Sequence, residues 1–304
     1  MHYLRPRFLE AVLFVKIFSL LPFWFLYGLC ELTAIFAYHI LRYRRDIVSQ
    51  NLAIAFPEKS ERERERIAKQ FYRQFLQVFA EMIKAYRFTK QDWQERVPIT
   101  NPEVVNKFMD AGVPVILMSG HTANWEWPGF SVSQQFDYNM EFLYKPIKKE
   151  WQDKTMLQMR QKHGSIAIPK DNAMREVIKR RKVPRLVGFI SDQQPSMGTE
   201  KYWLDFLNRP TAFYVGAERI ATLTQYAVFY VDTQRIARGR YEVSFRQIDE
   251  PPYEKGHRGI IAAFVKMLEA TIHRNPADYL WSHRRWKYTA EQEKEHLAAL
   301  KKEG

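Results

Sequence analysis

A histidine and a glutamate follow a short apolar run near the middle of the chain. The run at residues 113–118 (VPVILM) is followed closely by His121, and Glu126 stands five residues after the histidine. A histidine can accept a proton from a hydroxyl near neutral pH if a carboxylate fixes its tautomer and stabilises the imidazolium. The nucleophile can then be the alcohol of a substrate rather than a side chain of the protein. His121 and Glu126 are therefore candidates for a general base and its orienting carboxylate.

The spacing limits where these two side chains can lie. Five residues along one ideal helix would turn them about 140° apart. They can meet if His121 lies in the loop after a strand and Glu126 lies on the first turn of the next helix, which Thr122 or Asn124 would cap. The same residues also fit a loop histidine beside an ordinary surface glutamate. The spacing alone therefore does not establish a catalytic pair.

The sequence contains no competing catalytic pattern. There is no G-x-S-x-G elbow, Walker loop, dinucleotide-binding glycine pattern or H-E-x-x-H helix. The single cysteine, Cys30, excludes an internal disulfide and a cysteine-based metal site. The other histidines are scattered, without the spacing of metal ligands. We therefore expect neither a bound metal nor a cofactor.

From residue 112 onward, short apolar runs alternate with amphipathic stretches. This alternation predicts an α/β fold with a mostly parallel central sheet flanked by helices. Ligands of such sheets bind beyond the carboxyl ends of the strands, which is where His121 would lie. The expected strands are residues 113–118, 140–144, 165–168, 185–191, 227–232 and 241–247, and the expected helices are residues 150–162, 172–181, 214–224 and 255–274.

The N-terminal region is densely apolar. Pro22 divides residues 9–41 into two parts, and the second part, residues 23–41, has the roughly 20-residue length that a membrane span needs. Glu31 lies in the middle of that part, so a pair of buried core helices and a hairpin lying in the membrane interface are the alternatives. The RYRR sequence that follows favours a cytoplasmic location for the rest of the chain.

The segment that links this region to the sheet is expected to be helical. Residues 46–87 carry apolar side chains at three- and four-residue steps, with a break at Pro57 and a helix cap at Ser60. The whole sequence thus divides into a membrane-anchoring segment at residues 1–45, a catalytic domain at residues 46–290 and a charged C-terminal tail at residues 291–304.

The chain is strongly basic. Its 47 lysines and arginines against 34 acidic residues give a net charge of +13, which favours an anionic partner such as nucleic acid, anionic lipid or an acidic carrier or substrate. No nucleic-acid-binding motif is present, so nucleic acid is not expected as a partner. A length of 304 residues, 46% of them hydrophobic, is enough for one large domain with an appendage.

Five passages along the chain resemble the late acyltransferases of lipid A biosynthesis, within the wider glycerolipid acyltransferase superfamily. The ILMSGHTANWEW passage is similar to the His-x4-(Asp/Glu) block of that family, and YLWSHRRWK is similar to its Trp-x-His-Arg-Arg ending. The order and spacing of the passages strengthen the resemblance. The other three passages are RRDIVSQNLAIAFPE, GFISDQQP and WLDFLNRPTAFYVGAERIA.

The resemblance implies an activity. A member of this family transfers a fatty acyl chain from an acyl-carrier-protein or acyl-coenzyme A thioester to a hydroxyl of a lipid A precursor, forming an acyloxyacyl ester. His121 would be the general base and Glu126 would orient it, without a covalent acyl-enzyme. The implied location is the inner membrane of a bacterium, with the catalytic domain on the cytoplasmic side and with acyl carrier protein, the lipid A precursor and anionic membrane as partners.

Further residues are assigned from their positions. Asp192 follows a strand and is expected to hold the pocket through hydrogen bonds, with a structural role in its loop as the alternative. Lys145 and Lys170 also follow strands and could meet a phosphate or a developing oxyanion. Arg284 and Arg285 are expected to bind phosphate because a guanidinium matches its geometry, with an internal ion pair as the alternative.

Two other functions fit the same sequence. The first is acyl transfer to another lipid acceptor, such as a glycerophosphate, an amino-acid lipid or a glycosylated phospholipid. The second, from a different class, is a basic binding module tethered to a membrane. The sequence sets neither the acyl chain length, nor the acylated hydroxyl, nor the oligomeric state.

Overall fold

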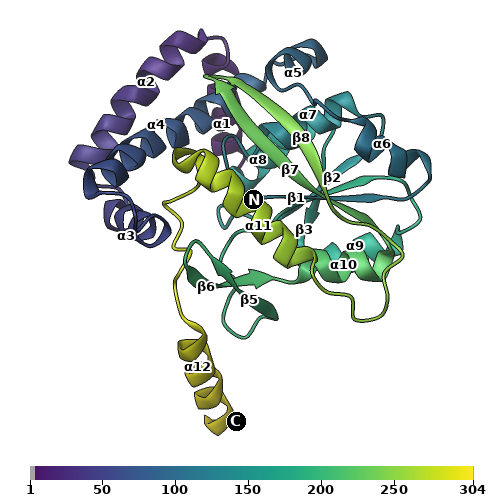
Figure 1. Cartoon of the computed structure of the whole chain (residues 1–304). Helices are drawn as coiled ribbons and strands as arrows, with labels where there is room; N and C mark the ends of the chain where they lie inside the picture. Colours follow the sequence, from purple (N-terminus) through teal and green to yellow (C-terminus); the bar gives the residue numbers. More distant parts are fainter. Residues whose placement is uncertain (1–3, 304) are drawn as a thin grey trace.

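The structure, a computed structural model, describes residues 4–303 of the chain (Figure 1). The strands in this range are β1 (Val115–Ser119), β2 (Met140–Tyr144), β3 (Ile166–Pro169), β4 (Leu186–Ile190), β5 (Lys201–Phe206), β6 (Arg209–Tyr214), β7 (Ala227–Ala237) and β8 (Arg240–Asp249). The α-helices are α1 (Leu4–Phe18), α2 (Phe23–Ile35), α3 (Arg45–Ala55), α4 (Glu61–Ala85), α5 (Lys90–Arg96), α6 (Glu103–Asp110), α7 (Trp127–Gln135), α8 (Glu150–Gln161), α9 (Ala173–Lys179), α10 (Gly216–Thr224), α11 (Ile260–Arg274) and α12 (Ala290–Glu303). A π-helix, η1 (Phe36–Ile40), continues α2, and two short 3-10 helices are η2 (Lys170–Asn172) and η3 (Pro276–Asp278).

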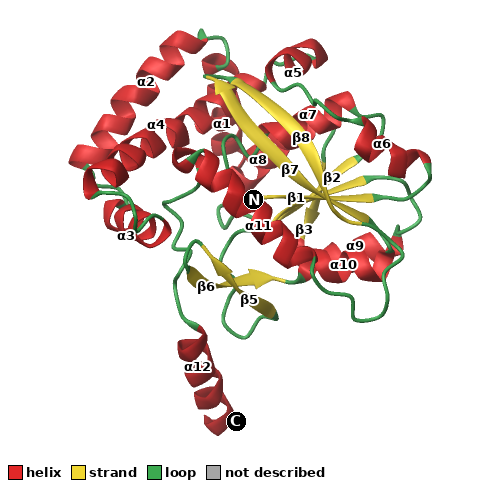
Figure 2. Ribbon diagram, in the orientation of Figure 1, coloured by secondary structure: helices red, strands yellow, loops and turns green. Residues whose placement is uncertain are grey.

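A mixed sheet forms the centre of the molecule. Its strand order within the described range is β3-β2-β4-β1-β7-β8. Every neighbouring pair is parallel except β7 and β8, which pair antiparallel. Helices cover both faces of this sheet (Figure 2). The predicted α/β fold with a mostly parallel sheet is therefore confirmed.

Strand β1 shows how its side chains serve both faces of the sheet. Alternate residues of a strand point to opposite sides, and all of Val115, Ile116, Leu117 and Met118 are at most 2% exposed. Val115 and Leu117 pack in a cluster with residues of α5, α6, α7 and α8. Ile116 and Met118 pack in a second cluster with residues of α9, α10 and α11. Burial on both faces explains why this strand reads as a continuous apolar run.

Strands β5 and β6 form a separate antiparallel hairpin that the sequence pattern did not predict. The hairpin turns at Leu207 and Asn208, whose φ angles of +50° and +64° lie in the left-handed region. A two-residue turn with both residues left-handed usually contains Asn-Gly or Asp-Gly. Leu207 occupies the first position because its side chain is fully buried, and its backbone N–H donates to Glu269 (2.8 Å).

The N-terminal helices lie along one side of the molecule. Pro22 stands at the start of α2, as predicted, and α2 packs against α4 while most of its other side chains stay exposed. The described range contains one helix long and apolar enough to cross a membrane, Phe23–Ile40, and only 28% of that stretch is buried. That low burial argues against a core helix. Glu31, in its middle, pairs with Arg73 of α4 and Arg238 of the β7–β8 turn.

The predicted C-terminal tail forms helix α12. Its Glu293 accepts a hydrogen bond from the backbone N–H of Gly198 (2.9 Å) and pairs with Lys201. Figure 1 shows α12 projecting from the rest of the fold beyond the β5–β6 hairpin.

Helix α4 begins with the predicted cap at Ser60, and this cap provides a test of the fold. The Ser60 hydroxyl accepts from the backbone N–H of Glu63, and the Glu63 carboxylate accepts from the backbone N–H of Ser60 (2.8 Å). We expect Ser60→Ala to reduce the free energy of unfolding by about 1 kcal/mol, because it leaves one N-terminal N–H without its acceptor. Urea denaturation of Ser60→Ala against Ser60→Thr, which keeps the hydroxyl, measures the effect. Equal stability of the two variants would contradict this role.

Candidate active site

The pairing of β1 with β4 brings two polar side chains to the same edge of the sheet. Ser119, the last residue of β1, pairs with Ile190, the last residue of β4. His121 lies two residues beyond the first strand and Asp192 two residues beyond the second. Because the strands are parallel, both residues emerge at the carboxyl edge of the sheet and lie next to each other.

Asp192 holds the imidazole of His121 directly. Its Oδ1 lies 2.6 Å from Nδ1 of His121, and its Oδ2 accepts the backbone N–H of the same residue (2.9 Å). The contact assigns the ring hydrogen to Nδ1 and leaves Nε2 as the acceptor, where the amide of Gln193 lies at 3.3 Å. The Asp192 side chain is 3% exposed and that of His121 is 13% exposed. The imidazole is therefore anchored by Asp192 at Nδ1 and remains partly exposed, with Gln193 beside Nε2.

The pair shifts the pKa of each partner. Burial alone would lower the pKa of His121, but the charge and hydrogen bond of Asp192, with a further contribution from the Glu126 charge, raise it above its usual value. Burial would raise the pKa of Asp192, yet His121 and then Arg285 lower it. Asp192 is therefore ionised, and His121 is a stronger base than a free histidine.

Glu126 does not make the contact that was expected of it. Both of its carboxylate oxygens accept from Arg160 of α8, at 3.0 Å from Nε and 2.6 Å from Nη2. The orienting hydrogen bond predicted for Glu126 is made by Asp192 instead. The reason is geometric: Asp192 reaches His121 from the adjacent strand, whereas Glu126 precedes α7 on the far side of a tight loop.

The loop between His121 and α7 is held at several points. Asn124 caps α7 as its Oδ1 accepts the backbone N–H groups of Glu126 (3.2 Å) and Trp127 (3.1 Å), which agrees with the predicted cap. Ala123 has a left-handed φ of +51° and donates its N–H to the carbonyl of Asp278 (2.8 Å). At the other end of the loop, a Cβ on Gly120 would come within 2.5 Å of the Leu268 side chain, which would have to shift to admit it.

The predicted basic residues fall into two groups. Lys145 follows β2 and Lys170 follows β3, so both lie exposed along the same carboxyl edge as His121. Arg284 is also exposed. Arg285, in contrast, is 1% exposed, and its guanidinium packs over the ring of Phe213 at 4.4 Å. Phosphate binding by Arg285 stays a prediction, and in this structure the guanidinium is buried instead of facing the surface.

Arg285 instead supports the loop that carries Asp192. It donates to the side-chain oxygen of Gln194 (2.8 Å), and Nε2 of His283 accepts the backbone N–H of the same glutamine (3.1 Å). Burial lowers the pKa of His283 to about 4, so its ring is neutral and can accept this bond. Arg285 is thus held internally by a side-chain amide and by the carbonyl of Ala212 (2.7 Å), which are neutral partners and not the acidic partner of the predicted ion pair.

Two residues near His121 were missed from the sequence. Arg160 lies in the last turn of α8 with no motif around it, and only its pairing with Glu126 marks it. Trp125 lies beside the imidazole, with ring centroids 5.4 Å apart, and stacks on Phe75 of α4. The spacing of apolar residues in α4 predicts a buried aromatic face that includes Phe75. It does not predict that Trp125 lies between that face and the imidazole.

A family model described as bacterial lipid A biosynthesis acyltransferase matches residues 3–288, which is nearly the whole chain. A search of curated proteins gives no match.

The geometry predicts the titration of His121. Asp192→Asn should lower the pKa of His121, because it removes the charge that outweighs burial. Glu126→Gln should lower it less, since the Glu126 charge contributes less. NMR titration of the imidazole C–H signals measures both shifts. An unchanged pKa in folded Asp192→Asn would contradict the pairing.

Proposed function

The chain belongs to the bacterial lipid A biosynthesis acyltransferase family, and we propose that it transfers a fatty acyl chain from an acyl-carrier-protein thioester to a hydroxyl of a lipid A precursor. The observation that carries the proposal is a partly exposed imidazole at the carboxyl edge of the sheet, held by Asp192 through Nδ1, with Nε2 next to the exposed side chain of Gln193. Such a group can activate an alcohol without a covalent enzyme intermediate.

The reaction needs one base that later acts as an acid. Nε2 of His121 accepts the proton of the acceptor hydroxyl as the oxygen attacks the thioester carbonyl. The tetrahedral intermediate then collapses, the carbon–sulfur bond breaks, and the thiolate of the carrier leaves. The imidazolium returns its proton to that sulfur, so a free thiol and an ester are the products. Asp192 stabilises the imidazolium between the two proton transfers and keeps the hydrogen on Nδ1.

Glu126 takes a different part from the one first expected. Its bidentate pair with Arg160 fixes a guanidinium beside the imidazole, and the charges of both residues act on His121. We therefore assign Glu126 to the charge environment of the base, and Asp192 to its orientation.

The acceptor and donor both carry negative charge, which exposed basic side chains can bind. Lys145, Lys170 and Arg284 are exposed, and a lipid A precursor presents phosphates on a glucosamine disaccharide. The net charge of +13 also attracts an acidic carrier protein and anionic lipid. These three side chains are the proposed phosphate contacts.

The N-terminal helices would keep this site at the surface of the bacterial inner membrane, on the cytoplasmic side. Their exposed apolar side chains are clustered on α1, α2 and η1 and are followed by the basic RYRR sequence. An apolar helix face next to basic residues binds anionic bilayers. The exposed large apolar residues of this face are Leu9, Leu13, Phe14, Ile17, Leu20, Trp24, Phe25, Leu29, Leu32, Ile35, Phe36, Ile40 and Leu41.

The function is tested in cells that lack the gene. Mass spectrometry of their lipid A should show the loss of one acyl chain, and fragmentation gives its length and position. Wild-type protein should restore the chain, whereas His121→Ala should not, because general-base catalysis contributes roughly 10²- to 10⁴-fold. Purified wild-type protein should also transfer acyl chains from acyl carrier protein to the precursor. Unchanged lipid A in the deletion, or full complementation by His121→Ala, would reject the proposal.

The membrane face is tested with a matched pair of exposed leucines. Leu32 on α2 is 68% exposed and Leu223 on α10 is 61% exposed. Leu32→Glu should weaken binding to vesicles of anionic phospholipid by about tenfold or more, since it puts a charge where an apolar side chain would enter the bilayer. Leu223→Glu should leave vesicle binding unchanged. Equal binding by the two variants in a sedimentation assay would place the membrane contact elsewhere.

A further inference from the structure

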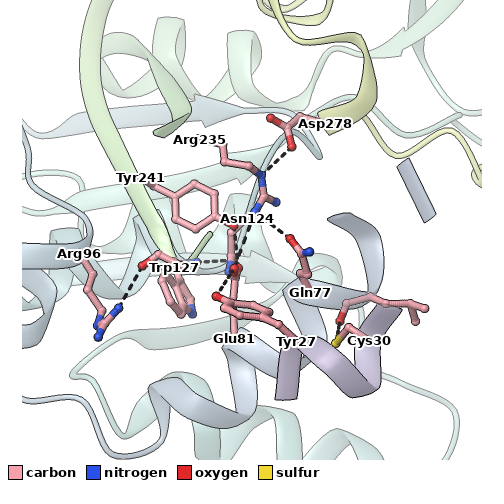
Figure 3. A network of polar contacts seen from close by, with 12 residues as sticks. Tyr27, Cys30, Gln77, Glu81, Arg96, Asn124, Trp127, Arg235, Tyr241 and Asp278 are labelled. Carbon is pink, nitrogen blue, oxygen red and sulfur yellow. Dashed lines mark hydrogen bonds and ion pairs between the residues drawn. The ribbon is translucent and has the colours of Figure 1, made fainter. Parts of the chain in front are cut away.

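A buried carboxylate lies behind the loop between His121 and α7, called the catalytic loop below, and takes no part in the reaction proposed above. Glu81, on α4, has no exposed surface. Its Oε1 accepts the hydroxyl of Tyr27 (3.0 Å) and lies 3.7 Å from Nη1 of Arg235. Its Oε2 accepts the amide of Asn124 (2.7 Å) and the hydroxyl of Tyr241 (2.7 Å). Figure 3 shows these groups converging on one carboxylate from α2, β7, β8 and the catalytic loop.

Asn124 connects Glu81 to the catalytic loop through hydrogen bonds. Its amide group donates to Glu81, while its side-chain oxygen accepts the backbone N–H groups of Glu126 and Trp127. Both ends of the Asn124 side chain are therefore occupied, and the residue cannot rotate without breaking a bond. The loop that it holds begins at His121.

A second attachment of the same loop leads back to the same carboxylate. Ala123 donates to the carbonyl of Asp278, and the Asp278 carboxylate binds Nε of Arg235 (3.0 Å). Arg235 in turn faces Glu81. The left-handed φ of Ala123 costs energy in a residue other than glycine and persists only if surrounding contacts impose it. The contacts that impose it converge on Glu81 and Arg235.

The network also ties the loop to the apolar N-terminal helix. Tyr27 lies on α2, and its hydroxyl packs closely against Gly239. A Cβ added to Gly239 would lie 2.5 Å from that hydroxyl. Gly239 lies in the turn between β7 and β8, the two strands that supply Arg235 and Tyr241. Helix α2, this hairpin and the loop of His121 are thus held together around Glu81.

We propose that Glu81 is a positioning residue for acyl transfer. It acts through Asn124 to hold the loop of His121 and Glu126 against the β7–β8 hairpin and helix α2. The inference rests on the function proposed above. Burying an ionised carboxylate gives weak support to stability, because desolvation offsets much of the attraction. Burial accordingly raises the pKa of Glu81 although Arg235 and its hydrogen-bond donors oppose this. The benefit of the network is therefore geometric.

The first variant removes the charge and keeps the shape. In Glu81→Gln, the new NH2 group must face either Asn124 or Arg235, and both are hydrogen-bond donors at those atoms. We expect kcat per folded molecule to fall roughly 10- to 100-fold, as displacements near 1 Å do in active sites, with KM for the acyl carrier thioester nearly unchanged. The assay uses full-length protein with lipid A precursor, and thermal melting gives the folded fraction.

A reciprocal exchange separates positioning from general destabilisation. Asn124→Asp alone places two carboxylates in contact and should also lower kcat. Combined with Glu81→Gln, it restores a donor and an acceptor at this contact, with the direction of the bond reversed and the net charge unchanged. The double variant should recover most of the lost kcat. If it is no more active than the weaker single variant, the proposal fails.

A matched control comes from a second buried acid. Asp232, on β7, has no exposed surface and binds Arg246 (2.7 Å) and Arg274 (3.1 Å to Nη1). Asp232→Asn should lower the melting temperature but leave kcat per folded molecule unchanged. A loss of kcat equal to that of Glu81→Gln would show a merely structural effect and overturn the proposal, as would wild-type kcat in Glu81→Gln.

Two further readouts keep the test decisive. If Glu81→Gln does not fold, Tyr241→Phe replaces it as the test, because it removes one donor from Oε2 and should lower kcat about 2- to 10-fold. An unchanged kcat in Tyr241→Phe rejects the role of Glu81.

If wild-type protein transfers no acyl chain, the proposed function fails. NMR signals of the His121 imidazole then report on the positioning alone: a shift in Glu81→Gln supports it, and unchanged signals reject it.

Discussion

The pairing register of β1 with β4 is the constraint on which the candidate site depends. Ser119 pairs with Ile190, so both strands end side by side. Two residues further along each chain, His121 and Asp192 lie 2.6 Å apart between Nδ1 and Oδ1. A slip of one residue would turn every side chain of the shifted strand to the other face. The burial of β1 on both faces prevents that slip, since its apolar residues would then lose their packing. The chemistry at the edge is thus specified by the core of the sheet.

Segments far apart in the sequence meet to support this edge. The C-terminal segment holds the Asp192 loop through His283 and Arg285, and is itself held by the N-terminal part of the chain. Asn51 donates to the carbonyls of Trp281 (2.8 Å) and His283 (2.9 Å), and Arg44 donates to that of Ser282 (2.9 Å). Two passages that resemble the family, RRDIVSQNLAIAFPE and YLWSHRRWK, are therefore partners in one structural contact. This explains why residues distant from the imidazole belong to the same pattern.

Local patterns predicted the strands and helices well where one element buries a periodic set of side chains, as in β1 and α4. They failed where the deciding contact is non-local. The β5–β6 hairpin was missed because its turn uses Leu207, an apolar residue selected by burial rather than by turn preference. The His-x4-Glu pattern predicts Glu126 as the orienting carboxylate, yet strand pairing places Asp192 against the imidazole. Nothing in the sequence distinguishes the buried Arg285 from the exposed Arg284 beside it.

The charges around His121 oppose one another, and this balance makes a usable base. Burial lowers the pKa of the imidazole, Asp192 and then Glu126 raise it, and Arg160 lowers it again. Without Arg160, two carboxylates would act on the ring and hold it protonated to higher pH, where it cannot accept a proton from an alcohol. Without Asp192, burial would prevail and the ring would be a weak base with no fixed tautomer. Arg160 therefore tempers the combined effect of Asp192 and Glu126. In the proposed reaction, this balance suits a base that takes a proton from a hydroxyl and then releases it to the departing thiolate.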